Sequence, residues 1–244
     1  WVVGADARGV MFGVGQLLRR MDLLPNSATL DDDFHCATAP DRAIRGHQIG
    51  YRATANSWDA WTVEQFDQYF RDLVVFGANC MENIPFQDGD ASPHMKLSRD
   101  EMNLHFSKLC MRYDLDHWLW VPVVFPVHDQ AKADEFLQRQ EKFYQACPRL
   151  DAIFVPGGDP GDNEAKLLLP YLQRMAEVAQ KYHPQAKVWL SLQGFSKQDI
   201  DDCFDYLTEQ KPDWFGGAVM GPSSPAMELT RKRLPEKYPL RWYP

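Results

Sequence analysis

Apolar positions along most of the chain fall into two alternating patterns. Short runs of consecutive apolar residues are typical of strands buried on both faces. Each run is followed by a longer stretch whose apolar residues recur at the three- and four-residue spacing of an amphipathic helix. The pattern predicts strands at 44–49, 78–84, 117–125, 152–155, 187–192, 214–220 and 240–243, and helices at 63–77, 99–113, 131–146, 163–182, 197–209 and 224–234.

The regular alternation of strand and helix predicts a parallel sheet with right-handed crossovers. The number of units fits a TIM-type (β/α)8 barrel better than a doubly wound sheet, and no Gly-x-Gly-x-x-Gly turn follows the first strand. Since a barrel needs eight strands, we expect an incomplete one of about six to seven βα units, truncated before its last strands. An open or partner-completed barrel is the alternative.

The segment before the first barrel strand has a different character. Apolar residues at helical spacing predict a helix over about 10–21, and residues 1–24 are interpreted as the end of a small N-terminal α/β domain. A polar stretch with an acidic run follows, so residues 25–43 are interpreted as a linker and 44–244 as the barrel. Within the barrel, Thr62 and Ser98 are predicted helix caps, and Pro170 is expected to kink or restart its helix.

Composition narrows the classes of partner. The formal net charge of −8 argues against nucleic acid or an anionic membrane surface. No apolar run reaches the length of a membrane span. The five cysteines lack zinc-ligand spacing, and we expect no metal and no cofactor. The chain begins at Trp1, which suggests a processed chain or a fragment. A periplasmic or secreted location, with the signal peptide outside this sequence, is one expectation; the sequence does not indicate the oligomeric state.

Polar residues gather after the predicted strands, where a barrel places its active site. Two carboxylates are the predicted catalytic residues: Asp159, in a glycine-rich turn after the fourth strand, and Glu82, at the end of the apolar second strand. The predicted substrate-binding residues, drawn from the same strand ends, are His47, Tyr51, Arg52, Trp58, Asn83, Asp162, Gln193 and Arg241.

Carboxylates combined with aromatic residues favour glycoside hydrolysis, which needs one protonated and one ionised group. Burial would raise the pKa of one carboxyl and suit Glu82 to the acid role. Structural alternatives remain: Asp159 or Asp162 caps the next helix, and Glu82 pairs with Arg45 or Arg52. Functional alternatives are a non-catalytic carbohydrate-binding protein and a metal-dependent sugar isomerase that uses Glu82, Asp159 and His128.

Two segments resemble a group of glycoside hydrolases. Residues 7–20 resemble the Arg-Gly…Leu-Leu helix that closes the N-terminal domain of alpha-glucuronidases and beta-hexosaminidases, in which a (β/α)8 barrel follows. Residues 155–161 are similar to the Gly-Gly-Asp-Glu motif of beta-hexosaminidases, where the Asp assists the substrate acetamido group and the Glu is the general acid. The resemblance implies the first role for Asp159, but Pro160 stands where the acid belongs. It implies a carbohydrate substrate, with uronic-acid- or hexosamine-containing oligo- or polysaccharides as options.

Overall fold

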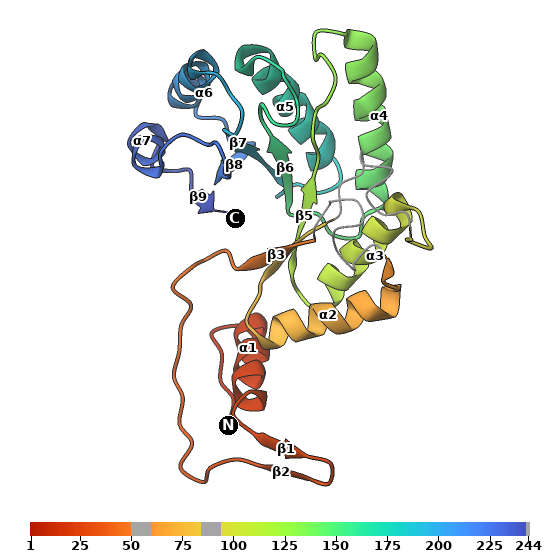
Figure 1. Ribbon diagram of the computed structural model, residues 1–244, viewed down its shortest axis with the longest axis vertical. Helices are drawn as coiled ribbons and strands as arrows, with labels where there is room; N and C mark the ends of the chain where they lie inside the picture. Colours follow the sequence, from red (N-terminus) through yellow and green to blue (C-terminus); the bar gives the residue numbers. More distant parts are fainter. Residues whose placement is uncertain (50–59, 84–93, 243–244) are drawn as a thin grey trace.

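The computed structural model describes residues 1–49, 60–83 and 94–242. Its centre is a seven-stranded parallel sheet in the order β3-β4-β5-β6-β7-β8-β9, which is also the order along the chain. The sheet curves into a partial TIM-type barrel, so the predicted fold class is confirmed (Figure 1). The strands are β3 (Gly46–Gln48), β4 (Cys80–Glu82), β5 (Asp116–Trp120), β6 (Ala152–Pro156), β7 (Lys187–Ser191), β8 (Phe215–Met220) and β9 (Leu240–Trp242).

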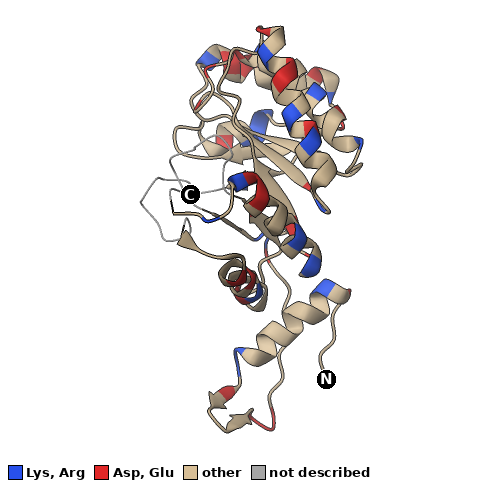
Figure 2. Ribbon diagram, turned by 90° about the vertical axis from the view of Figure 1, so that its right-hand side faces the viewer, with Lys and Arg blue, Asp and Glu red and all other residues tan. Residues whose placement is uncertain are grey.

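Helices between the strands cover the outer face of the sheet (Figure 1). Charged residues of both signs lie along these helices (Figure 2), as expected of faces in contact with water. Capping boxes at Thr62 and Ser98 begin α2 and α3, which confirms both predicted caps. The helices are α2 (Val63–Val75), α3 (Arg99–Arg112), α4 (Gln130–Ala146), α5 (Ala165–Gln180), α6 (Lys197–Gln210) and α7 (Met227–Arg233).

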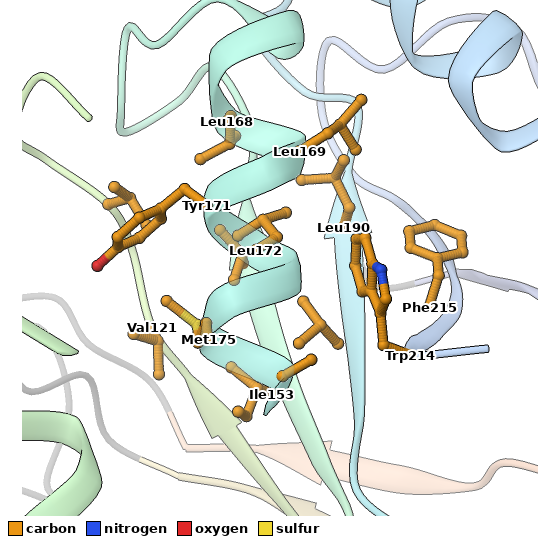
Figure 3. Packing of buried hydrophobic residues seen from close by; sticks show 14 of the residues in the cluster. Val121, Ile153, Leu168, Leu169, Tyr171, Leu172, Met175, Leu190, Trp214 and Phe215 are labelled. Carbon is orange, nitrogen blue, oxygen red and sulfur yellow. The ribbon is translucent and has the colours of Figure 1, made fainter. Parts of the chain in front are cut away.

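Two apolar layers hold the barrel together, one on each face of the sheet. On the outer face, Leu172 and Met175 of α5 pack over Ile153 and Leu190 (Figure 3). Full burial of one such side chain contributes about 1.5–3 kcal/mol. The inner face is lined by buried aromatic residues, and these fill the interior of the curved sheet: Trp118, Trp120, Phe154 and Trp189.

The N-terminal segment differs in part from its prediction. The helix α1 (Ala7–Leu18) begins three residues earlier than expected, because the Asp6 side chain accepts a hydrogen bond from the Gly9 amide and caps it. Residues 22–29 form an antiparallel hairpin of β1 (Asp22–Leu24) and β2 (Ser27–Thr29), so the predicted polar linker contains a strand. The hairpin projects away from the barrel (Figure 1).

Two barrel elements also differ from the pattern. The α5 helix runs through Pro170 as one element, so the expected restart is wrong. The strand predicted at 117–125 ends at Trp120, although Val121 and Val123 remain buried. Buried apolar residues therefore continue beyond the hydrogen-bonded ladder, and apolar pattern alone overestimates the strand length.

Candidate active site at the carboxyl edge of the sheet

The turn after β6 is shaped by close contact with the turn after β7. Strand-like pairing continues past β6, because the Gly158 amide donates to the Gln193 carbonyl oxygen at 2.9 Å. A Cβ atom on Gly158 would lie 2.5 Å from the backbone of Gly194, which itself has φ +72°. Only glycine fits both positions, so the glycines bring the two turns together.

This contact places Asp159 beside Gln193. The Gln193 Nε2 atom donates to Asp159 Oδ2 at 3.0 Å, and the Asp159 side chain is exposed. The peptide bond between Asp159 and Pro160 is cis. Two residues predicted from separate strand ends thus meet at the carboxyl edge of the sheet, the edge at which parallel barrels carry out their chemistry.

The helix-cap alternative for the two aspartates is wrong. The N-cap residue of α5 is Glu164, which makes no side-chain cap, and the Ala165 amide instead donates to Asp199 Oδ1 at 2.8 Å. Asp162 is exposed in a left-handed conformation with φ 56°. Neither Asp159 nor Asp162 is therefore required to begin the helix.

The buried Asn163, which follows the same predicted strand but is not among the predicted site residues, joins this turn to the preceding one. Its Oδ1 accepts from the Val127 amide at 2.9 Å, and its Nδ2 donates to the Phe125 carbonyl oxygen at 2.9 Å. Asn163 is thus a positioning residue for the edge where Asp159 lies. An Asn two residues after Gly161, just before a predicted helix, is the sequence signal that points to such a turn-bracing role.

Glu82 lies in the barrel interior, where both of its carboxylate oxygens accept hydrogen bonds from other side chains. Arg241 donates to its Oε2 at 2.8 Å, and the Gln48 amide donates to its Oε1. The exposed side-chain fractions are 1% for Glu82 and 10% for Arg241. Burial raises the pKa of Glu82, while the positive charge of Arg241 and the hydrogen bond from Gln48 oppose that rise.

The Arg241 guanidinium is itself held between aromatic rings. Its central carbon lies 4.3 Å from the Trp118 ring centre and 5.9 Å from that of Phe154. The partner of Glu82 is therefore Arg241 on β9. Arg45, one of the partners expected for Glu82, donates instead to backbone oxygens, among them that of Gly77.

The sheet register separates the two predicted catalytic carboxylates. Glu82 is level with Trp118, which is level with Ala152, and Asp159 follows Ala152 by seven residues. With about 3.3 Å per residue and about 4.8 Å between strands, the two backbones lie on the order of 20 Å apart. Acid–base pairs of glycosidases are separated by about 5–9.5 Å, so the structure does not bring Asp159 and Glu82 together as such a pair.

The remaining predicted binding residues have other surroundings. His47 faces the helix layer, where its ring meets that of Tyr69 edge-on at 5.5 Å, and burial lowers its pKa. Asn83 is buried, and its Oδ1 accepts from the Trp120 amide at 3.1 Å. His47 and Asn83 thus take part in packing. Tyr51, Arg52 and Trp58 lie outside the described residues.

A metal centre finds no support in the described part of the chain. Within residues 1–49, 60–83 and 94–242, no group of three His, Cys, Asp or Glu side chains could hold a metal ion. Glu82, Asp159 and His128, the ligands expected for a sugar isomerase, therefore do not form such a group. None of the described helices is long and apolar enough to span a membrane. A groove of about 250 Å³ lies along α2 and is lined by Trp61, Gln65, Gln68, Tyr69 and Asp72.

Comparison with known proteins shows a likeness of fold. No family profile and no curated protein sequence matches the chain. A solved glycoside hydrolase family 20 beta-N-acetylglucosaminidase superposes with a TM-score of 0.55 and 10% identity, over 90% of this chain and 60% of that one. A beta-1,4-mannanase from the sea hare Aplysia kurodai gives 0.48 and 11%, over 91% and 82% of the two chains.

The chain thus spans about 60% of the length of the beta-N-acetylglucosaminidase that it matches. A putative alpha-L-fucosidase from Bacteroides thetaiotaomicron gives a TM-score of 0.45 at 8% identity, over 82% and 59% of the two chains. The resemblance to alpha-glucuronidases stays a prediction. What the comparison shows is a distant structural similarity to TIM-barrel glycoside hydrolases.

Proposed function

We propose that this chain forms the barrel of a glycoside hydrolase that acts on a poly- or oligosaccharide, with Asp159 as one of its catalytic carboxylates. The observation that carries the proposal is the exposed Asp159 carboxylate, held by Gln193 at the carboxyl edge of a parallel barrel sheet. The barrel similarity to glycoside hydrolases supports it at the level of fold alone.

The geometry leaves Asp159 open to a substrate. The Gln193 amide donates to Oδ2 and so helps to orient the carboxylate. Within the described residues, no hydrogen bond to Oδ1 is seen, so this oxygen can accept from a sugar hydroxyl, an acetamido group or an attacking water. In each case the negative charge stabilises positive charge that develops on the substrate.

Glu82 takes a different part in the proposal. Its carboxylate is buried and bound by both Arg241 and Gln48, so it is unsuited to transfer a proton to a substrate oxygen. We assign it to the architecture of the barrel: with Arg241 it links β4 to β9 across the interior. Hydrolysis then needs a proton donor other than Glu82, and the residue after Asp159 cannot supply it because that residue is Pro160.

A non-catalytic carbohydrate-binding protein is the second candidate. Pro160 favours it, since no acidic side chain adjoins Asp159 at the position where the similar motif has its general acid. Such a protein would use the same carboxylate and amide to accept and donate hydrogen bonds to a sugar, without bond cleavage.

A panel of aryl glycosides and of uronic-acid- and hexosamine-containing oligosaccharides tests the proposal with the full-length protein. We expect the release of aryl alcohol or of shorter sugars from at least one member, measured by absorbance and chromatography. Saturable sugar binding without cleavage would replace the proposal with the second candidate. Neither binding nor cleavage across the panel would contradict both.

A further inference from the structure

The first helix is joined to the middle of the barrel by ion pairs. The Arg8 guanidinium of α1 donates to both carboxylate oxygens of Asp114 at 3.1 Å and to Asp116 Oδ1 at 3.0 Å. Asp114 lies in the turn before β5, and Asp116 is the first residue of that strand. One side chain of the N-terminal segment thus holds the start of a central strand, more than 100 residues further along the chain.

A second arginine shares these carboxylates and extends the cluster to the next strand. Arg149 donates to Asp114 at 2.7 Å, to Asp116 at 2.8 Å and to Asp151 at 2.7 Å. Asp151 in turn accepts from the His117 amide of β5 at 2.8 Å. The cluster is therefore built into the β5 and β6 starts, which gives Arg8 a fixed anchor instead of an isolated surface partner.

The other end of α1 contacts the first βα unit. Gly15 is buried against the backbone of Val75, where a Cβ atom would come within 2.5 Å of its carbonyl oxygen. Arg19 donates to that same carbonyl oxygen at the end of α2. Phe12 lies under the Arg45 guanidinium at 5.3 Å, and Arg45 immediately precedes β3.

We propose that α1 is a strap that ties the first βα unit of the barrel, β3 and α2, to the central strands β5 and β6. β3 pairs with β4 over only three residues, so the ladder contributes few hydrogen bonds to this unit and contacts with α1 add to them. The strap makes α1 part of the barrel's packing.

Arg8 supplies the ionic contacts of the strap to β5. Two guanidinium groups hold the pKa of Asp114 down at about 2, with the hydrogen bond from Arg8 as the largest cause. Arg8 is about one-fifth exposed, so water screens its ion pairs only in part. Its removal takes away the only α1 side chain, among the described contacts, that reaches Asp114 and Asp116.

Hydrogen exchange measured by mass spectrometry on the full-length protein tests the strap. In Arg8→Ala, amides of α1, α2 and β3 are expected to exchange about fivefold faster, while those of β6 to β8 stay as in the wild type. Arg20→Ala is the matched control, because Arg20 follows the same helix, is exposed and, among the described residues, forms no side-chain hydrogen bond or ion pair. This control is expected to leave the exchange of α2 and β3 unchanged.

Asp114→Asn supplies an independent variant that removes the charge from the other side. Asp114 has φ 50°, and Asn is one of the non-glycine residues that adopt this backbone most readily, so the turn is expected to keep its shape. Arg8→Ala and Asp114→Asn should raise the exchange rates of the same three elements. In the double variant, the fold-increase in rate should be smaller than the product of the two single fold-increases. Faster exchange confined to α1, an equal rise throughout the barrel, or a match to Arg20→Ala would overturn the strap.

Discussion

Arg241→Met is expected to lower the free energy of unfolding by about 3–5 kcal/mol, because it leaves the Glu82 carboxylate buried without its cation. Methionine keeps most of the apolar length that packs on Trp118, so the loss reports the charge and not a cavity. Urea unfolding followed by fluorescence measures it. The exposed Arg231→Met on α7 is the matched control, with an expected change within about 0.5 kcal/mol.

The double variant Arg241→Met with Glu82→Gln should recover most of the lost stability, since a neutral amide can still accept from Gln48.

The loss of stability in Arg241→Met should also depend on pH. Burial, no longer opposed by Arg241, holds the folded-state pKa of Glu82 above the ordinary 4.5, so the folded state binds the proton more tightly. Stability is then greatest at low pH and falls as pH rises through the folded pKa. A loss equal at pH 5 and pH 8 would contradict the assignment.

Asp159→Asn is expected to lower kcat by about 10²–10⁴-fold on whichever glycoside the protein hydrolyses, because the amide carries no charge to stabilise the transition state. Folding should be unaffected, since the side chain is exposed and does not cap α5. Initial rates and the unfolding midpoint of the same preparation measure the two effects separately.

Glu164→Gln is the control for that measurement. Glu164 lies five residues further along the same turn, is exposed, and pairs with Lys166 at 2.6 Å on the first turn of α5. Its rate should match the wild type. An Asp159→Asn protein that retains full activity would remove Asp159 from the catalytic residues, whatever the fold.

The fold could be predicted because its signals are local. Each buried strand is a short apolar run and each helix has its own apolar stripe, so the order of elements follows from the chain alone. The hairpin at 22–29 was missed for the same reason: all of its strand residues are exposed, and no apolar alternation marks them. The length of β5 was overestimated because buried residues continue beyond Trp120, where the strand pairing stops.

The site could be predicted only in part, because its contacts join distant residues. Asp159 and Gln193 follow adjacent strands, so strand order was enough to place them near each other. The bond between Glu82 and Arg241 spans 159 positions along the chain and crosses the interior, and no spacing rule indicates it. That His47 faces outward could have been predicted, because side chains alternate between the two faces of a strand and the neighbours of His47 are Gly46 and Gln48.

The location of a bound sugar tests the central claim most directly. A crystal structure of the full-length protein with the oligosaccharide that the panel identifies, or with its product, would show where the sugar lies. We predict a sugar ring between the turns after β6 and β7, with an oxygen or nitrogen atom within about 3.2 Å of the Asp159 carboxylate. A sugar bound elsewhere, in the groove along α2 for example, with Asp159 facing only solvent, would contradict it.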